Sequence, residues 1–175
     1  MAKHYYSEED VLALARNGYR SGEAGFPVET GDCALLVIDM QEEFVKPGWT
    51  PYWVPEATRQ VPLIAKLIAY CRHVNFPVIY TAFSHTHKGL DRYPFGYLMP
   101  NRYPDLDIDR SAYFKEGHIV SELAPLDNEV VIFKPSYGAF CDTSLDIILK
   151  NLRKNTVIIC GTLTNYCCGL TARQA

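Results

Sequence analysis

The apolar run Ala34-Leu-Leu-Val-Ile38 is followed directly by an acid, Asp39. A run this short that is apolar at every position is typical of a β-strand buried on both faces, as the central strands of parallel sheets are. The charged residue at its end marks the point where such a strand leaves the core. We therefore interpret this stretch as a central strand and place the rest of the chain around it.

Apolar runs of the same kind recur along the chain, and segments with helical spacing separate them. Three further strands are predicted, at 77–83, 129–133 and 156–160. Helices are predicted near 56–74, after a cap at Asp142 or Thr143, and from about Asn165. Strands that alternate with helices predict an α/β fold, with a mostly parallel central sheet and helices on both faces.

Length and composition favour one soluble domain. The chain has 175 residues, of which 48% are hydrophobic and 21% charged, and its net charge of -3 offers no basic surface for nucleic acid. No apolar run reaches membrane-spanning length and the N-terminus has no signal core, so we expect a cytoplasmic protein that does not bind membranes. The six cysteines include no CxxC pair, and we expect them to be reduced.

The first 30 residues are predicted to form an arm, and residues 31–175 the domain. Ser7-Glu-Glu-Asp10 is a capping box that predicts a short helix near 8–17, which glycines from Gly18 onward end. Such an arm buries little by itself, so we expect it to pack on the domain or on another subunit of a homo-oligomer. The last predicted helix stops at Ala175 without a closing strand, and we expect the natural chain to continue.

Residues that directly follow the apolar runs are the candidates for chemistry, because open parallel sheets bind ligands beyond the carboxyl ends of their strands. Asp39 follows the first run, Lys134 the third, and the loop 161–167, which ends in Cys167, the fourth. Singly, the acid could be a helix cap, the lysine a solvated strand end and the thiol core packing. Their convergence at one edge of the sheet favours a catalytic set.

The chemistry of these groups is complementary. A cysteine attacks as its thiolate, and a free thiol titrates at about pH 8.5. If Thr164 caps the last helix, Cys167 lies in its first turn, where the helix dipole and Lys134 both favour the thiolate. Asp39 is placed to accept the thiol proton and to return it to a departing amine. The backbone N–H groups of Leu163 and Cys167 are the expected donors to an oxyanion.

Three stretches of the chain resemble the isochorismatase-like cysteine hydrolase superfamily. They are 35–44 (LLVIDMQEEF), 134–140 (KPSYGAF) and 161–168 (GTLTNYCC). The resemblance runs from about Cys33 to Ala175 and implies a three-layer Rossmann-like fold. It also implies the Asp39, Lys134 and Cys167 triad of the branch that includes nicotinamidases, N-carbamoylsarcosine amidohydrolase and ureido- or biuret-type hydrolases. A C-terminal strand and helix of that fold are expected to be missing from this sequence.

The resemblance places the nucleophile at Cys167 rather than Cys168 and implies a cis peptide between Thr162 and Leu163. It implies hydrolysis of a C–N bond in a small amide, ureido or carbamoyl compound, through a covalent acyl-enzyme intermediate. The expected partner is therefore a small-molecule substrate. Four side chains are expected to contact it: Phe44, Tyr137, Thr164 and Asn165.

Two positions depart from the superfamily pattern. Nicotinamidases carry an Asp-x-His metal pattern after the second strand, where this chain has Ser84-His-Thr-His87. His85 and His87 are therefore only weak metal candidates, and no metal or other cofactor is expected. Gly138 stands where the superfamily often has serine, a change that either opens the pocket slightly or has no effect.

Three alternatives to ureido or carbamoyl hydrolysis stay open. A nicotinamidase-type carboxamide hydrolase would use the same triad. Isochorismatases cleave a vinyl ether with the aspartate as acid and need no thiol, so the presence of Cys167 favours C–N hydrolysis over that reaction. A non-catalytic binding subunit would have no need of an intact acid, base and thiol.

Overall fold

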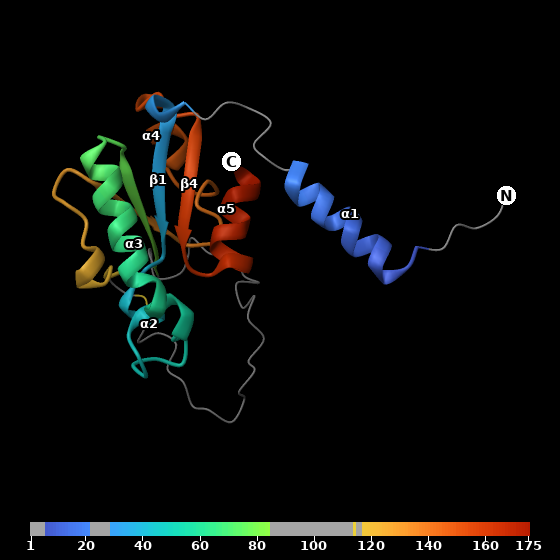
Figure 1. Ribbon diagram of the computed structural model, residues 1–175. Coiled ribbons are helices and arrows are strands. Elements are labelled where there is room, and N and C mark those ends of the chain that lie inside the picture. Colours follow the sequence, from blue (N-terminus) through green and yellow to red (C-terminus); the bar gives the residue numbers. More distant parts are fainter. Residues whose placement is uncertain (1–5, 22–28, 85–113, 115–116) are drawn as a thin grey trace.

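Four parallel strands form a single sheet in the computed structural model, which describes residues 6–21, 29–84, 114 and 117–175. The strands are β1 (Cys33–Ile38), β2 (Val78–Phe83), β3 (Val130–Lys134) and β4 (Thr156–Gly161). Their order in the sheet is β3-β2-β1-β4 (Figure 1). The strands predicted from the apolar runs are confirmed, each within one residue of its expected ends.

The central strand β1 pairs with β2 on one side and β4 on the other, and all six of its residues are buried. Leu35 and Val37 belong to the core on one face of the sheet, and Leu36 and Ile38 to the core on the other. A strand covered on both faces has no room for solvated side chains, which explains its apolar sequence. Asp39 follows with a left-handed backbone, at φ 49°, and turns the chain out of the sheet.

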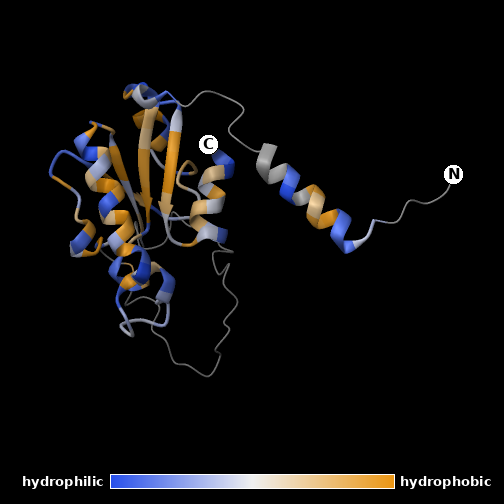
Figure 2. Cartoon of the chain, viewed as in Figure 1, coloured by the Kyte–Doolittle hydropathy of each residue, from blue (hydrophilic) through white to orange (hydrophobic). Residues whose placement is uncertain are grey.

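Helices cover both faces of the sheet. They are α2 (Glu42–Val45), α3 (Pro55–His73), α4 (Leu145–Asn151) and α5 (Gly169–Gln174), with shorter turns η1 (Thr30–Asp32), η4 (Ser121–Leu123) and η5 (Thr164–Cys168). α3 sends Ile64 and Ile68 into the Leu35 core, whereas α4 sends Leu145 and Leu149 into the opposite core. Figure 2 shows the strands as the most hydrophobic elements between these helices. The three-layer α/β prediction is confirmed.

The start of α4 differs from the predicted cap. Neither Asp142 nor Thr143 is the N-cap residue, because the helix begins after Ser144, whose side chain makes no capping hydrogen bond. The Thr143 hydroxyl nevertheless accepts a hydrogen bond from the Leu145 N–H at 3.1 Å. A side chain one position before the N-cap residue therefore satisfies a free N–H donor at the start of the helix.

A partly buried ion pair ties α3 to the turn that precedes β3. Two guanidinium nitrogens of Arg72 bind the two carboxylate oxygens of Glu129, at 2.8 and 2.7 Å. Arg72 also donates to the Tyr80 hydroxyl at 3.1 Å. Burial, reinforced by Glu129, raises the pKa of Tyr80 to about 12. This cluster lies on the α3 face of β2.

The N-terminal helix α1 (Glu8–Ser21) begins as the capping box predicts. The Ser7 hydroxyl accepts from the Asp10 N–H, and the Asp10 carboxylate accepts from the Ser7 N–H, at 3.1 and 2.9 Å. The predicted end near residue 17 is wrong, because the helix continues through Gly18 to Ser21. One glycine costs an exposed helix only about 1 kcal/mol and does not have to end it. In Figure 1, α1 lies apart from the sheet.

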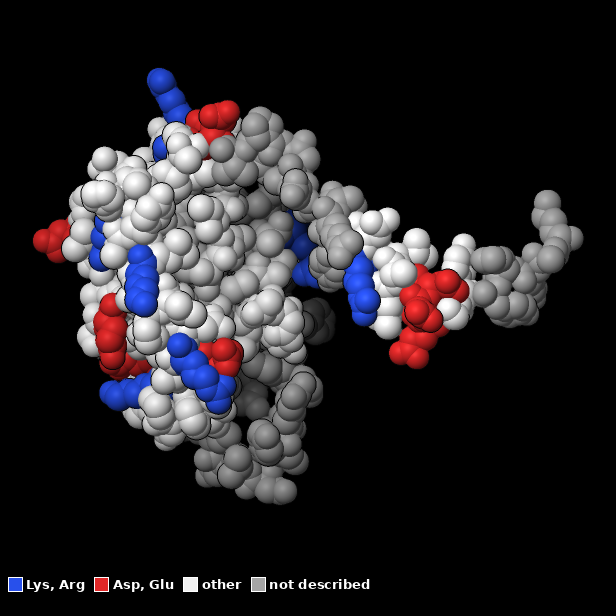
Figure 3. Space-filling model, viewed as in Figure 1, with Lys and Arg blue, Asp and Glu red and all other residues white. Residues whose placement is uncertain are grey.

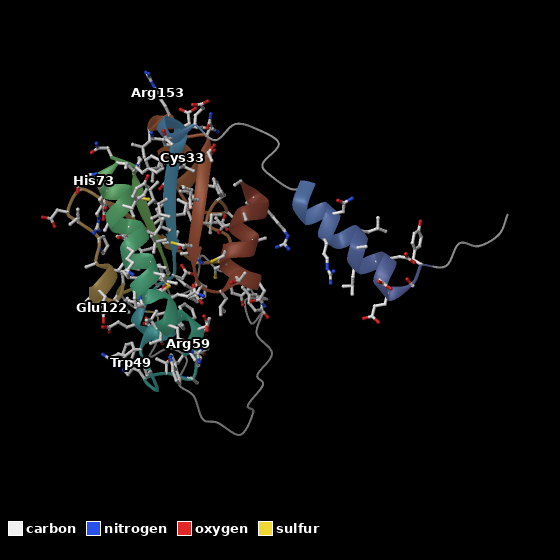
Figure 4. The ribbon with its side chains drawn as sticks, viewed as in Figure 1. Cys33, Trp49, Arg59, His73, Glu122 and Arg153 are labelled. Atoms are coloured by element: carbon white, nitrogen blue, oxygen red, sulfur yellow. The ribbon has the colours of Figure 1, made fainter. Side chains whose placement is uncertain are left out.

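Among the helices described, none is both long and apolar enough to cross a membrane. On the face of the molecule in Figure 3, Lys and Arg side chains alternate with Asp and Glu side chains instead of gathering into one patch. Figure 4 labels Cys33 near the amino end of the sheet and Trp49 beyond the end toward which the strands point. That carboxyl end carries the residues described next.

Candidate active site

The structure brings Asp39, Lys134 and Cys167 together at the carboxyl edge of the sheet. Asp39 follows β1, Lys134 is the last residue of β3, and Cys167 lies in the turn η5 that follows β4. Asp39 and Lys134 are fully buried and Cys167 is 4% exposed. The carboxyl ends of parallel strands all lie at the same edge of the sheet. Residues that are far apart in the chain therefore become neighbours at that edge.

Asp39 and Lys134 form a buried ion pair. The Lys134 ammonium lies 2.7 Å from Asp39 Oδ2 and donates to the Ser136 carbonyl at 3.0 Å. It also sits 5.3 Å from the centre of the Phe83 ring, within the range of a cation–π contact. Each charge therefore has a compensating partner in a place without water, as buried charges require.

The second oxygen of the Asp39 carboxylate is held by Thr81. The Thr81 hydroxyl donates to Asp39 Oδ1 at 2.7 Å, and the Thr81 carbonyl accepts from the Asp39 N–H at 3.1 Å. Thr81 lies on β2 and is fully buried. The sequence predictions missed this residue, although a polar side chain inside an otherwise apolar strand is a signal for a buried partner.

Gln41 is a second buried polar residue that the sequence predictions missed. Its side-chain amide donates to the Phe83 carbonyl at 2.9 Å, and its carbonyl oxygen accepts from the Phe83 N–H at 2.6 Å. The side chain replaces backbone pairing at the point where β1 and β2 separate. It therefore fixes the end of β2, which carries Phe83 against Lys134.

The Cys167 thiol is not activated as the sequence suggested. Burial raises the pKa of Cys167, the Asp39 carboxylate raises it further, and Lys134 only partly opposes them. The predicted lowering is wrong because the lysine charge is already paired with Asp39 and the thiolate would be cut off from water. The resting thiol is therefore protonated, with the carboxylate beside it as the proton acceptor.

Asp39 and Lys134 distinguish the two neighbouring thiols. Both residues influence the pKa of Cys167 through hydrogen bonds as well as charge, whereas they influence Cys168 through charge alone. Burial is the main cause that raises the pKa of Cys168, to about 12. Cys168 packs at the edge of the core on the α4 face. This geometry supports Cys167 as the nucleophile.

The turn that carries Cys167 is of π type, and its cap is not the predicted one. Leu163, rather than Thr164, is the N-cap residue of η5, and no side chain caps it. The Leu163 carbonyl accepts from the N–H groups of Tyr166 and Cys168, both at 3.1 Å. The peptide between Thr162 and Leu163 is cis, as the resemblance implied. Within the described part of the chain, the Leu163 N–H has no protein acceptor.

Aromatic rings continue from the site along the sheet edge. Phe114 lies at centroid distances of 5.0 Å from Phe44 and 5.3 Å from Phe83. Tyr137 lies 6.3 Å from Phe83 and 5.4 Å from Tyr166. We call these five rings, Phe44, Phe114, Phe83, Tyr137 and Tyr166, the aromatic wall. It includes two of the four predicted substrate contacts.

Comparison with known proteins agrees with this fold. The isochorismatase domain family matches residues 33–175. The chain belongs to the isochorismatase family. Enterobactin synthase component B of Escherichia coli K12 is 31% identical over 145 residues, which cover 81% of this chain and 47% of that protein. The chain thus spans about half the length of this relative.

Two other members of the isochorismatase family extend the comparison. N-carbamoylsarcosine amidase of an Arthrobacter species is 26% identical over 180 residues, which cover 96% of this chain and 66% of that protein. The structure of a cysteine hydrolase from Pseudomonas syringae pv. phaseolicola 1448A is similar with a TM-score of 0.74 and 29% identity. That similarity covers 85% of this chain and 68% of the other.

The remaining predicted contacts of this isochorismatase-family chain lie on its surface or outside the described residues. Thr164 and Asn165 are exposed at the start of η5. His85 and His87 lie outside the described residues. Among the residues that are described, no group of three or more His, Cys, Asp or Glu side chains is arranged to hold a metal ion.

Gly138, where the superfamily often has serine, lies against the side chain of Gln174 in α5. A Cβ atom there would lie 2.1 Å from Gln174 Oε1. The same oxygen accepts from the Phe140 N–H at 3.3 Å. The glutamine amide therefore occupies the space beside the loop that follows Lys134, and a larger residue at 138 would have to displace it.

Proposed function

We propose that this protein hydrolyses a C–N bond in a small ureido or carbamoyl compound, with Cys167 as the nucleophile. The observation that carries the proposal is the buried Asp39–Lys134 pair, at 2.7 Å, beside the protonated Cys167 thiol. A carboxylate next to a neutral thiol is a general base ready to create the thiolate when substrate arrives. The Lys134 ammonium balances the charge of that carboxylate.

The reaction follows from these positions. Asp39 Oδ2 takes the proton of Cys167 as Sγ bonds to the substrate carbonyl carbon, and the backbone N–H groups of Leu163 and Cys167 stabilise the oxyanion. Asp39 returns the proton to the substrate nitrogen, the C–N bond breaks, and ammonia or an amine leaves. Water then attacks the carbonyl carbon of the carbamoyl-enzyme, an S-thiocarbamate on Cys167, and gives its proton to Asp39. The C–S bond breaks and Cys167 regains the proton.

Two observations favour ureido or carbamoyl substrates. The N-carbamoylsarcosine amidase match covers 96% of the chain, a share that includes most of the first 30 residues, whereas the E. coli relative covers 81%. In addition, Ser84-His-Thr-His87 lacks the carboxylate of the nicotinamidase metal pattern. Phe83, Tyr137 and Tyr166 in the aromatic wall are partly exposed and offer flat apolar surface to a planar carbamoyl group, whereas Phe44 and Phe114 are buried in the core.

An isochorismatase-type vinyl-ether hydrolase is the second candidate, because a relative named isochorismatase, from Bacillus subtilis 168, is 33% identical over 141 residues, which cover 81% of this chain and 42% of that protein. That chemistry needs an acid at Asp39 but no thiol. The two candidates therefore differ in what they require of Cys167.

An ammonia-release assay over N-carbamoyl amino acids, ureides and nicotinamide, run beside a vinyl-ether panel, tests the proposal. We expect ammonia from a carbamoyl or ureido compound, and a loss of at least about a thousandfold in kcat with Cys167→Ala or Asp39→Asn. Cys168→Ala is the matched control and should keep activity. Vinyl-ether turnover that survives Cys167→Ala but not Asp39→Asn would establish the second candidate instead.

A further inference from the structure

Thr81 holds Asp39 at two points. Its carbonyl accepts from the Asp39 N–H, and its hydroxyl donates to Asp39 Oδ1 at 2.7 Å. Thr81 pairs with Ile38 in the β1–β2 register, directly before Asp39 leaves the sheet. The side chain is fully buried, so water does not compete for its hydroxyl.

We propose that Thr81 is a positioning residue that gives the two oxygens of Asp39 different roles. Thr81 occupies Oδ1, so Oδ2, which contacts Lys134, is left as the oxygen that receives the Cys167 proton. The proposal rests on the role of Asp39 as base in the proposed function. It adds a residue from β2, a strand that contributes no member of the triad.

The hydroxyl also favours one protonation state of Asp39. An ionised carboxylate only accepts hydrogen bonds, so a donor aimed at it stabilises the charged form over the acid. Among the described residues, the titratable or charged groups that face Asp39 are Lys134 from β3 and Cys167 and Cys168 from η5. Lys134 shares the preference for a charged Asp39. Removing the hydroxyl leaves Lys134 as the main partner of the carboxylate.

Thr81→Val tests this with little change of shape, and Thr81→Ser keeps the hydroxyl. We expect the acid limb of kcat/KM for a carbamoyl substrate to move up by about one pH unit in Thr81→Val, because a hydrogen bond to a charged group is lost. Thr81→Ser should follow the wild type. Tyr80→Phe is the matched control, since it removes a hydroxyl from the neighbouring residue, which packs on the other face of β2.

A second measurement does not need substrate. A crystal structure of Thr81→Val should show the Asp39 carboxylate turned from its place, with Oδ2 further from the Lys134 ammonium than the 2.7 Å of the wild type, whereas Thr81→Ser and Tyr80→Phe should keep that distance. If Thr81→Val does not fold, Thr81→Ala takes its place with the same expectation. An Asp39 carboxylate that keeps its position in Thr81→Val overturns the inference. If no substrate releases ammonia, the proposed function is overturned. The second measurement can still be made in that case, because it needs no substrate.

Discussion

A thiol buried beside a carboxylate keeps its proton, because the thiolate would lose hydration and face a like charge. Cys167 is in this position: burial and then Asp39 raise its pKa, and Lys134 offsets only part of the effect. Reactivity at this residue therefore depends on a substrate that draws the proton across to Asp39, rather than on a thiolate that is present at rest. We therefore expect the Cys167 thiol to be alkylated and oxidised slowly in the absence of substrate.

Substituting Asp39 should make Cys167 more reactive toward alkylation while abolishing hydrolysis. Asp39→Asn removes the charge that raises the Cys167 pKa and leaves Lys134 unpaired beside the thiol. At pH 7.5, a value chosen for the assay, we expect iodoacetamide to modify Cys167 at least about tenfold faster than in the wild type, a change of one pKa unit. Mass spectrometry of the labelled peptides measures this directly.

Exposed Cys141 provides an internal reference for that experiment. Its rate of alkylation should be the same in both proteins, and faster than that of Cys167 in the wild type. Slower labelling of Cys167 in Asp39→Asn would contradict the argument, because it would mean that alkylation itself needs the carboxylate as a base.

At the scale of the secondary-structure elements, hydrogen bonds from the loop that follows Lys134 connect that loop to α5. Because α5 directly continues the turn η5, the loop is held close to Cys167. Thr171 lies one turn beyond Cys167, is fully buried, and accepts from the Ala139 N–H at 3.0 Å. Gln174, one turn further, accepts from the Phe140 N–H. One helix face therefore holds the β3 loop against the turn η5.

Thr171→Val should destabilise the protein by about 1–2 kcal/mol, because the Ala139 N–H is left buried without an acceptor. Thr171→Ser keeps the oxygen and should lose less than half as much. Urea unfolding followed by circular dichroism gives both values. Equal losses in the two variants would mean that the methyl group, and not the hydrogen bond, matters at this position.

For the whole molecule, the exposed apolar side chains of α1 are the feature that a single chain does not explain. Val11 is 54% exposed and Leu14 61% exposed, and their spacing places them on one face of the helix. An exposed apolar stripe of this kind is typical of a surface that is covered in an assembly. We propose, as the sequence led us to expect, that the protein is a homo-oligomer in which α1 contributes to the interface.

Leu14→Glu should shift the protein toward smaller species in size-exclusion chromatography with light scattering. A charge buried in an apolar interface is costly unless it is paired, so the contact should weaken. Ala13→Glu introduces the same charge about 100° around the axis of α1 from Leu14, away from the face shared by Val11 and Leu14, and serves as the control. A wild-type protein that is monomeric at the highest concentration tested would refute the proposed oligomer.

The sequence by itself determined where the four strands lie along the chain, to within one residue, and their alternation with helices. It also placed Asp39, Lys134 and Cys167 at or beyond the carboxyl ends of strands, but it did not predict the order of the strands in the sheet. These features are local: a strand buried on both faces must be apolar throughout, and the first polar residue after it must lie at the sheet edge. The capping box of α1 is local for the same reason, since Ser7 and Asp10 are three residues apart.

Only the tertiary structure decided which groups surround those residues. Thr81 and Asp39 are 42 positions apart in the chain, as are Gln41 and Phe83, so no periodicity relates them. The direction of the Cys167 pKa also came from packing, because burial and a charge from another strand outweigh the local effect of a helix start. Hydrogen bonds and desolvation depend on distances between residues that are brought together only by folding. Apolar periodicity, in contrast, depends on residues that are close in the sequence.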